Sequence, residues 1–384
     1  MVTRQRIVSY GIPTVATATI VAAALLTTGT KKSLVTPDPM VPVHVIPSYS
    51  GTDGHQIDVV FAVDTTGSMG GLLDGAKRTV WSIASHIKKT DPEANIRIGL
   101  VAYKDVGDEY VTKPFMLTTD LDAVYGELAS YTAAGGGDTP EDVDAALDDT
   151  LHKMQWRSGA KKLVFVVGDA PPASRGEVPT YDVLAREAAE RGITINTIRC
   201  GFDPQTQLAF SRMAEIGNGE FSTIQQDGGV QQVATPFDDR LADLSSKIDD
   251  TAIAYGSEGV RARYEEKMAK NAAAPAPAKA DRAAYYSKGG GMKRGDDDLV
   301  GGYATGSVAL EAVPEAELPA DLRGRDKGEI KAEVEKRVAT RRALQKQVED
   351  LSKQRDEFLK NNANKDEGGF DAKVKSTVER QLKK

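Results

Sequence analysis

The sequence predicts an α/β domain built on a doubly wound, mostly parallel sheet with one antiparallel edge strand. Short apolar runs alternate with stretches of helical periodicity between residues 55 and 256. The run 163–167 is apolar throughout, as expected for a strand that is buried on both faces. The strand-like runs 95–105 and 110–118 follow each other too closely for a crossover helix, which predicts a hairpin at the sheet edge.

The elements can be assigned in order along the chain. Residues 57–64 (IDVVFAVD) are an expected strand, and 72–90 an amphipathic helix with apolar residues at helical spacing. Residues 120–131 begin with an acidic cap and predict a second helix. Three glycines then lead to Pro140, which suits the first turn of a third helix. The remaining expected elements are strand 161–169, helix 180–192, strand 193–201, helix 203–219, strand 220–224 and a closing helix within 229–255 that starts or breaks near Pro236.

The N-terminal segment, residues 1–32, predicts export. Basic residues flank an uncharged apolar stretch, 11–29, whose length of about 19 residues is at the lower edge of a membrane span. We expect an uncleaved signal anchor or a cleaved signal peptide. The former would hold the protein at the inner membrane, facing the periplasm or extracytoplasmic space. Cleavage would leave it periplasmic or secreted. Residues 33–54 are Pro-rich and read as a linker.

The C-terminal part divides into two expected regions. Residues 257–328 are rich in Ala, Pro and Gly and predict a weakly ordered linker. Residues 329–384 are charged and favour helix, with a weak apolar stripe. A single helix is the simpler interpretation, because Arg341 and Arg355 fall where a coiled-coil seam should be apolar. This tail could still serve as a docking or self-association arm.

The amino-acid composition disfavours several classes of function. The formal net charge of −7 disfavours a nucleic-acid partner. Cys200 is the one cysteine, which excludes an intrachain disulfide and a cysteine zinc cluster, and we expect it to be a buried, inert thiol. The four histidines show no metal-ligand spacing.

Three loops carry oxygen-bearing side chains toward one edge of the predicted sheet. Asp64, Thr66 and Ser68 follow the first strand, Thr139 precedes a helix, and Asp169 ends a buried strand. Ligands of open α/β sheets bind at the carboxyl ends of the strands, where these loops can meet. Carboxylate and hydroxyl oxygens suit a hard cation, so we expect Mg²⁺, with Mn²⁺ or Ca²⁺ as alternatives.

A plainer interpretation is available for each of these residues. Asp64 could be an acid at a strand-to-helix turn, Thr139 a helix cap before Pro140, and Asp169 a turn acid before Pro171. The cation site is favoured because all three loops are expected at one edge.

The motifs "DTTGS", "GGGDTPEDV" and "VVGDAPP" resemble the von Willebrand factor type A (VWA) family with its metal-ion-dependent adhesion site, and look most like bacterial members. The resemblance covers residues 55–256. It implies direct metal ligation by Thr66 and Ser68, ligation by Asp64 and Asp169 directly or through water, and recruitment of Thr139 in a high-affinity state. Ala170-Pro171-Pro172 departs from the glycine of many relatives and puts a large switch of that loop in doubt.

The resemblance implies a binding module, not an enzyme: an acidic side chain of a partner protein would complete the metal's coordination. Two alternatives stay open. One is a membrane-tethered scaffold with the C-terminal helix as an oligomerisation arm. The other, disfavoured, is a metal-assisted phosphohydrolase with Asp64 as nucleophile, because no histidine base lies near these loops in the sequence.

Overall fold

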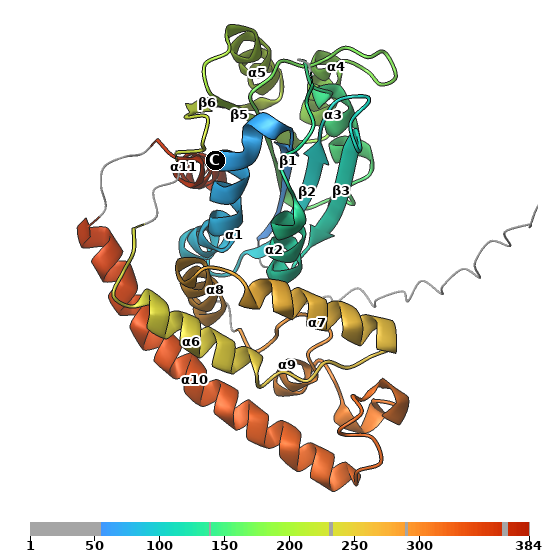
Figure 1. Cartoon of the computed structure of the whole chain (residues 1–384), viewed down its shortest axis with the longest axis vertical. Coiled ribbons are helices and arrows are strands. Elements are labelled where there is room, and N and C mark those ends of the chain that lie inside the picture. The colour runs from blue at the N-terminus through green and yellow to red at the C-terminus, as the bar shows by residue number, and fades with distance from the viewer. Residues whose placement is uncertain (1–54, 138–139, 230–232, 289–290, 363–367, 384) are drawn as a thin grey trace, which may run out of the picture. The chain divides into compact units, whose positions relative to one another are not determined.

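The computed structural model describes residues 55–137, 140–229, 233–288, 291–362 and 368–383. They contain a six-stranded sheet in the order β3-β2-β1-β4-β5-β6 (Figure 1). The strands are β1 (Gln56–Asp64), β2 (Asn95–Tyr103), β3 (Thr112–Thr118), β4 (Lys161–Gly168), β5 (Ile193–Cys200) and β6 (Asn218–Ile224). Strand β3 runs antiparallel to β2, and all other neighbours are parallel. The predicted sheet with one antiparallel edge strand is confirmed.

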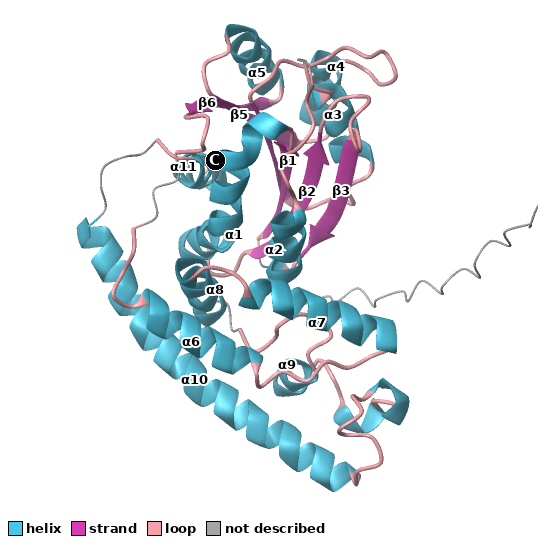
Figure 2. Ribbon diagram, in the orientation of Figure 1, coloured by secondary structure: helices cyan, strands magenta, loops and turns pink. Residues whose placement is uncertain are grey.

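Helices cover both faces of this sheet (Figure 2). Alternate residues of β1 point to opposite sides, so that Val59, Phe61 and Val63 join one core while Val60 and Ala62 join the other. The first core is closed by α1 (Gly70–Thr90), α2 (Leu121–Ser130) and α11 (Phe370–Leu382). The second is closed by α3 (Val143–His152), α4 (Tyr181–Glu190) and α5 (Pro204–Ile216). Two-sided burial explains why the central strands are apolar at nearly every position.

Acidic caps set the start of several helices. The carboxylates of Asp120, Asp142 and Asp203 each accept a hydrogen bond from a backbone N–H in the first turn of the helix that follows. The expectation that Pro140 lies in the first turn of a helix is wrong, because α3 begins only at Val143. Glu141 instead makes an isolated β-bridge with Pro172, which keeps this stretch extended.

Helices occupy much of the region in which the sequence predicted a linker. They are α7 (Glu258–Ala272), α8 (Ala276–Lys288) and α9 (Leu299–Ala304). Pro277 lies in the first turn of α8, where its missing N–H is not needed, and the alanines around it favour helix. Arg282 then anchors α8 through buried ion pairs with Asp122 and Asp249, both 2.6 Å long. Residues 257–288 are thus part of the packed structure.

The long helix α10 (Lys327–Asn362) packs against α6 (Asp238–Asp249), α8 and α9 of the same chain. Its arginines at the disfavoured seam positions are buried: Arg341 pairs with Asp298, and Arg355 with Asp238 and Asp281. Apolar positions on α10 join two small cores with α6, α8 and α9. Self-association stays a prediction, and it would need a surface other than this stripe.

The predicted signal segment and Pro-rich linker, residues 1–54, lie outside the described residues. Among the helices that the structure describes, none is long and apolar enough to cross a membrane. Export and membrane attachment therefore stay predictions.

Candidate metal centre

The first loop begins at the carboxyl end of β1 with a fully buried aspartate. Asp64 Oδ1 accepts hydrogen bonds from the Thr66 backbone N–H, 2.8 Å away, and from Thr66 Oγ1, 2.7 Å away. The hydroxyls of Thr66 and Ser68 lie 3.4 Å apart. The intervening Thr65 turns the other way, with its hydroxyl donating to the Tyr103 carbonyl at 3.0 Å. The loop therefore gathers the side chains of residues 64, 66 and 68, as their alternate spacing predicted.

The second oxygen of Asp64 is the most informative atom of the site. Oδ2 is buried, and no hydrogen-bond donor among the described residues reaches it. Burial raises the pKa of Asp64 to about 7 despite the hydrogen bonds from Thr66, and the nearby Asp169 carboxylate adds to the rise. An unpaired buried carboxylate oxygen costs free energy unless a proton or a cation compensates it.

Asp169 follows β4 directly and is partly exposed. Its Oδ2 accepts a hydrogen bond of 2.5 Å from the side-chain amide of Gln226, which also donates to the Ser68 carbonyl at 3.3 Å. The backbone carbonyl of Asp169 accepts from Thr206 Oγ1 on α5 at 3.1 Å. The first and third predicted loops therefore meet, and Gln226 joins them.

Thr139, the predicted ligand of the second loop, lies outside the described residues. The chain before it is anchored to the first loop, because Gly67 N–H donates to the Gly135 carbonyl at 3.1 Å. The chain after it is anchored to the third loop, because Glu141 N–H donates to the Pro171 carbonyl at 3.1 Å. Both flanks of this loop therefore lie at the same edge of the sheet as Asp64 and Asp169.

Two glycines permit this close assembly. Gly136 has a φ of 75°, and a Cβ there would lie 2.8 Å from the Cβ of Thr66. A Cβ on Gly168 would lie 2.4 Å from the Tyr103 hydroxyl and 3.5 Å from Asp64 Oδ2. A larger residue at either position would displace a side chain of the site.

The donor set fits a hard divalent cation. It combines two carboxylates, one of them with an unsatisfied buried oxygen, and two hydroxyls. The described residues contain no group of three or more His, Cys, Asp and Glu side chains that could hold a metal. A cation here would therefore depend on hydroxyl oxygens and water, which Mg²⁺ accepts more readily than softer metals do.

Sequence reasoning missed two residues that shape the site. Gln226 follows β6 at the carboxyl edge, so its position two residues after a strand end was an available signal. Asp108 accepts the Gly136 N–H through its carboxylate at 3.1 Å, a contact across 28 residues that no local pattern indicates. Cys200, as expected, is buried, and burial together with the Asp169 and Asp64 carboxylates raises the pKa of its thiol well above the usual value.

Comparison with known proteins matches part of this chain to a family model. Residues 58–236 match the family model of the von Willebrand factor type A domain. The chain is 30% identical over 131 residues to a putative ariadne-like RING finger protein R811 of Acanthamoeba polyphaga mimivirus, which covers 34% of this chain and 12% of that protein. It is 28% identical over 194 residues to von Willebrand factor A domain-containing protein 7 of Mus musculus, which covers 48% of this chain and 21% of that protein. The chain thus spans at most about a fifth of the length of these two relatives.

Comparison with solved structures found BatB from Bacteroides thetaiotaomicron, with a TM-score of 0.35, 15% identity and coverage of 44% of this chain and 90% of that one. Proximal thread matrix protein 1 from the mussel byssus, in a form with a zinc-occupied MIDAS motif, gives a TM-score of 0.36 and 16% identity over 44% of this chain and 41% of that one. The two relatives with sequence similarity described above come from a virus and a mammal, so the resemblance to bacterial members stays a prediction. On the family match, residues 58–236 of this chain are a von Willebrand factor type A domain.

Proposed function

We propose that this VWA domain binds a divalent cation at the carboxyl edge of its sheet and uses it to bind an acidic side chain of a protein partner. Asp64, Thr66, Ser68, Thr139 and Asp169 would hold the cation, with Mg²⁺ the expected metal and Mn²⁺ or Ca²⁺ the alternatives. The observation that carries the proposal is the buried, unsatisfied Oδ2 of Asp64 beside a second carboxylate. The bound metal would supply an open coordination position for a further oxygen ligand.

The protein's own groups have distinct roles in this arrangement. The Asp64 and Asp169 carboxylates offset the two positive charges, while the hydroxyls of Thr66 and Ser68 provide neutral oxygens. The hydrogen bonds from Thr66 to Asp64 Oδ1 orient that carboxylate, which leaves Oδ2 for the metal. A partner carboxylate would then take the open coordination position of the cation as a further oxygen ligand.

Exposed apolar side chains around the edge favour a protein partner. Val106 follows β2, Phe202 follows β5 and Leu208 lies in α5, with exposed fractions of 51%, 82% and 74%. Such residues beside a polar site are typical of protein-binding surfaces. The hydrolase alternative has no comparable support: each of the three described histidines is paired with carboxylates outside these loops.

Titration calorimetry of the full chain with Mg²⁺ and Mn²⁺ tests cation binding. We expect Asp64→Asn and Thr66→Val to abolish the binding heat. Two matched controls should retain it: Asp239→Asn, at an exposed position of α6, and Thr65→Val, whose hydroxyl points to Tyr103 and Tyr110. Equal heats from the wild type and Asp64→Asn would contradict the proposed site.

Partner binding needs a separate measurement. The immobilised chain should retain a protein in Mg²⁺ and release it in chelator, and the Asp64→Asn chain should retain none. Substitution of one Asp or Glu of the captured partner should then remove binding. A partner that binds equally in chelator would contradict the role of the cation even if the cation itself binds.

A further inference from the structure

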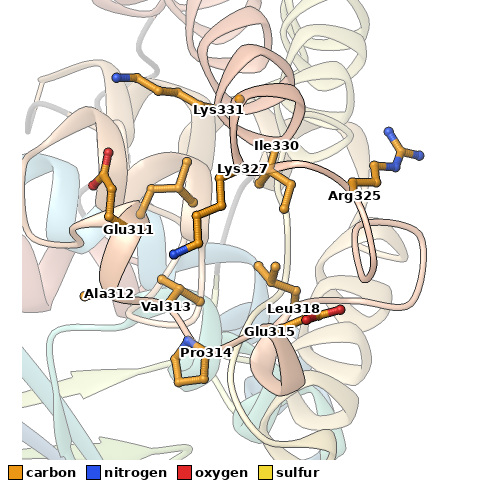
Figure 3. A pocket seen from close by; sticks show the side chains of 12 residues that line it. Glu311, Ala312, Val313, Pro314, Glu315, Leu318, Arg325, Lys327, Ile330 and Lys331 are labelled. Atoms are coloured by element: carbon orange, nitrogen blue, oxygen red, sulfur yellow. The ribbon is translucent and has the colours of Figure 1, made fainter.

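A second candidate site lies far from the sheet edge, between residues 310–318 and the start of α10 (Figure 3). It is a pocket of about 590 Å³, within the ~300–1,000 Å³ of small-molecule sites. Two short 3₁₀ turns, Leu310–Ala312 and Glu315–Glu317, form one wall, and the first turn of α10 forms the other. None of the proposed cation ligands lines it.

The floor of the pocket is apolar and held in place. Leu318 and Ile330 are buried in the small core that α9 and α10 share, and Val313 packs against it. The backbone of the wall is fixed by the Arg323 guanidinium, whose Nε donates to the Leu318 carbonyl at 2.7 Å. The cavity is therefore formed before any ligand arrives, as is usual for small-molecule sites.

Three basic side chains lie around this apolar floor. Figure 3 shows the ammonium of Lys327 directed into the pocket, with Lys331 and Arg325 at its margins. In the described part of the chain, Lys327 and Lys331 make no side-chain ion pair or hydrogen bond, whereas Arg325 is near enough to Glu333 to attract its carboxylate. Glu311 and Glu315 also line the pocket, and Glu315 already accepts the Gly324 N–H at 2.8 Å.

We propose that this pocket binds a single-chain amphiphilic carboxylate, with the carboxylate at Lys327 and the apolar chain along Val313, Leu318 and Ile330. Three basic and two acidic lining residues leave one net positive charge, which complements a monoanion better than a doubly charged phosphate. The apolar floor requires a hydrocarbon part, so a small hydrophilic acid fits only one half of the site. This site is independent of the cation site and of its proposed partner.

Calorimetric titration of the full chain with octanoate, 1-octanol and acetate tests both halves of the proposal. Octanoate should bind; 1-octanol, which lacks the charge, should bind about two- to fivefold more weakly, because the ion pair with the exposed Lys327 ammonium is lost. Acetate, which lacks the chain, should not bind measurably. Equal affinities for octanoate and 1-octanol, or no octanoate binding at millimolar concentration, would overturn the proposal.

Substitutions then locate the binding. Lys327→Gln should weaken octanoate binding about two- to fivefold and remove its preference over 1-octanol. Lys336→Gln, an exposed position further along α10, should leave both affinities unchanged. Both lysines are exposed, so equal thermal midpoints of the two variants will show that the fold is intact. Octanoate binding that is unaffected by Lys327→Gln would place the ligand elsewhere and refute the assignment.

Discussion

Replacing Asp64 by Asn should stabilise the metal-free protein while it abolishes cation binding. The buried carboxylate has a pKa of about 7 in the folded chain, against 3.8 for an unperturbed aspartate. Keeping it ionised in the folded state at pH 8 therefore costs about 4 kcal/mol of unfolding free energy. Asparagine retains the acceptor for Thr66 and carries no charge, so the variant avoids this cost.

The pH dependence of the free energy of unfolding separates the effect of the Asp64 charge from other effects of the substitution. Because the pKa is raised on folding, the folded state keeps a proton that the unfolded state releases between pH 3.8 and about 7. Wild-type stability should thus fall relative to Asp64→Asn by about 1.4 kcal/mol per pH unit in this window. From pH 5 to pH 8 the advantage of the variant should grow by about 3 kcal/mol.

Urea unfolding in chelator at pH 5, 6, 7 and 8 measures this difference for both proteins. Added Mg²⁺ at pH 8 should then raise the stability of the wild type alone, by about 2.7 kcal/mol at a hundred times Kd. A stability difference that does not change with pH, or a wild type that is more stable than the variant in chelator at pH 8, would refute the reasoning about Asp64.

Two further predictions concern residues outside the proposed ligand set. Gln226→Ala should tighten Mn²⁺ binding in calorimetry by several-fold, because its amide no longer competes for Asp169; weaker binding would instead make Gln226 a ligand. Arg341→Met should lower the free energy of unfolding by about 3–5 kcal/mol, since it leaves Asp298 buried and unpaired. The exposed neighbour offers the control Arg342→Met, which should change stability by less than about 0.5 kcal/mol, and equal effects of the two would contradict a role for the buried pair.

The sheet and its loops could be predicted because their signals are local. Apolar runs mark the strands, and the acids and hydroxyls that follow them at 64, 66, 68 and 169 fall at strand ends whatever the exact packing. The role of Gln226 depends on which side chain it meets across the edge, and its contact with Asp169 spans 57 residues. Local sequence patterns do not predict a contact between residues so far apart in the chain.

The packing of the helices after residue 256 could not be predicted for a related reason: a helix is expected after residue 329, but α7 and α8 are not expected. An arginine at a would-be apolar position argues against burial unless its acidic partner is known. For Arg341 that partner is Asp298, 43 residues earlier, and for Arg355 it is Asp238, 117 residues earlier. Alternating alanine and proline are typical of a linker, but alanine is also the best helix former. Ion pairs between residues distant in the sequence help these helices to pack, and the amino-acid composition does not reveal such pairs.

The packing of α11 has a consequence for how the chain can fold during synthesis. Phe370, at the start of this helix, packs on Phe61 of the central strand with ring centroids 6.1 Å apart, and Val374 and Val378 continue the same core. The ribosome adds the residues from 61 to 370 over roughly 15–60 s at ~5–20 residues per second. Throughout that interval one face of the sheet lacks the cover that α11 provides, so the nascent protein exposes apolar surface until this helix emerges.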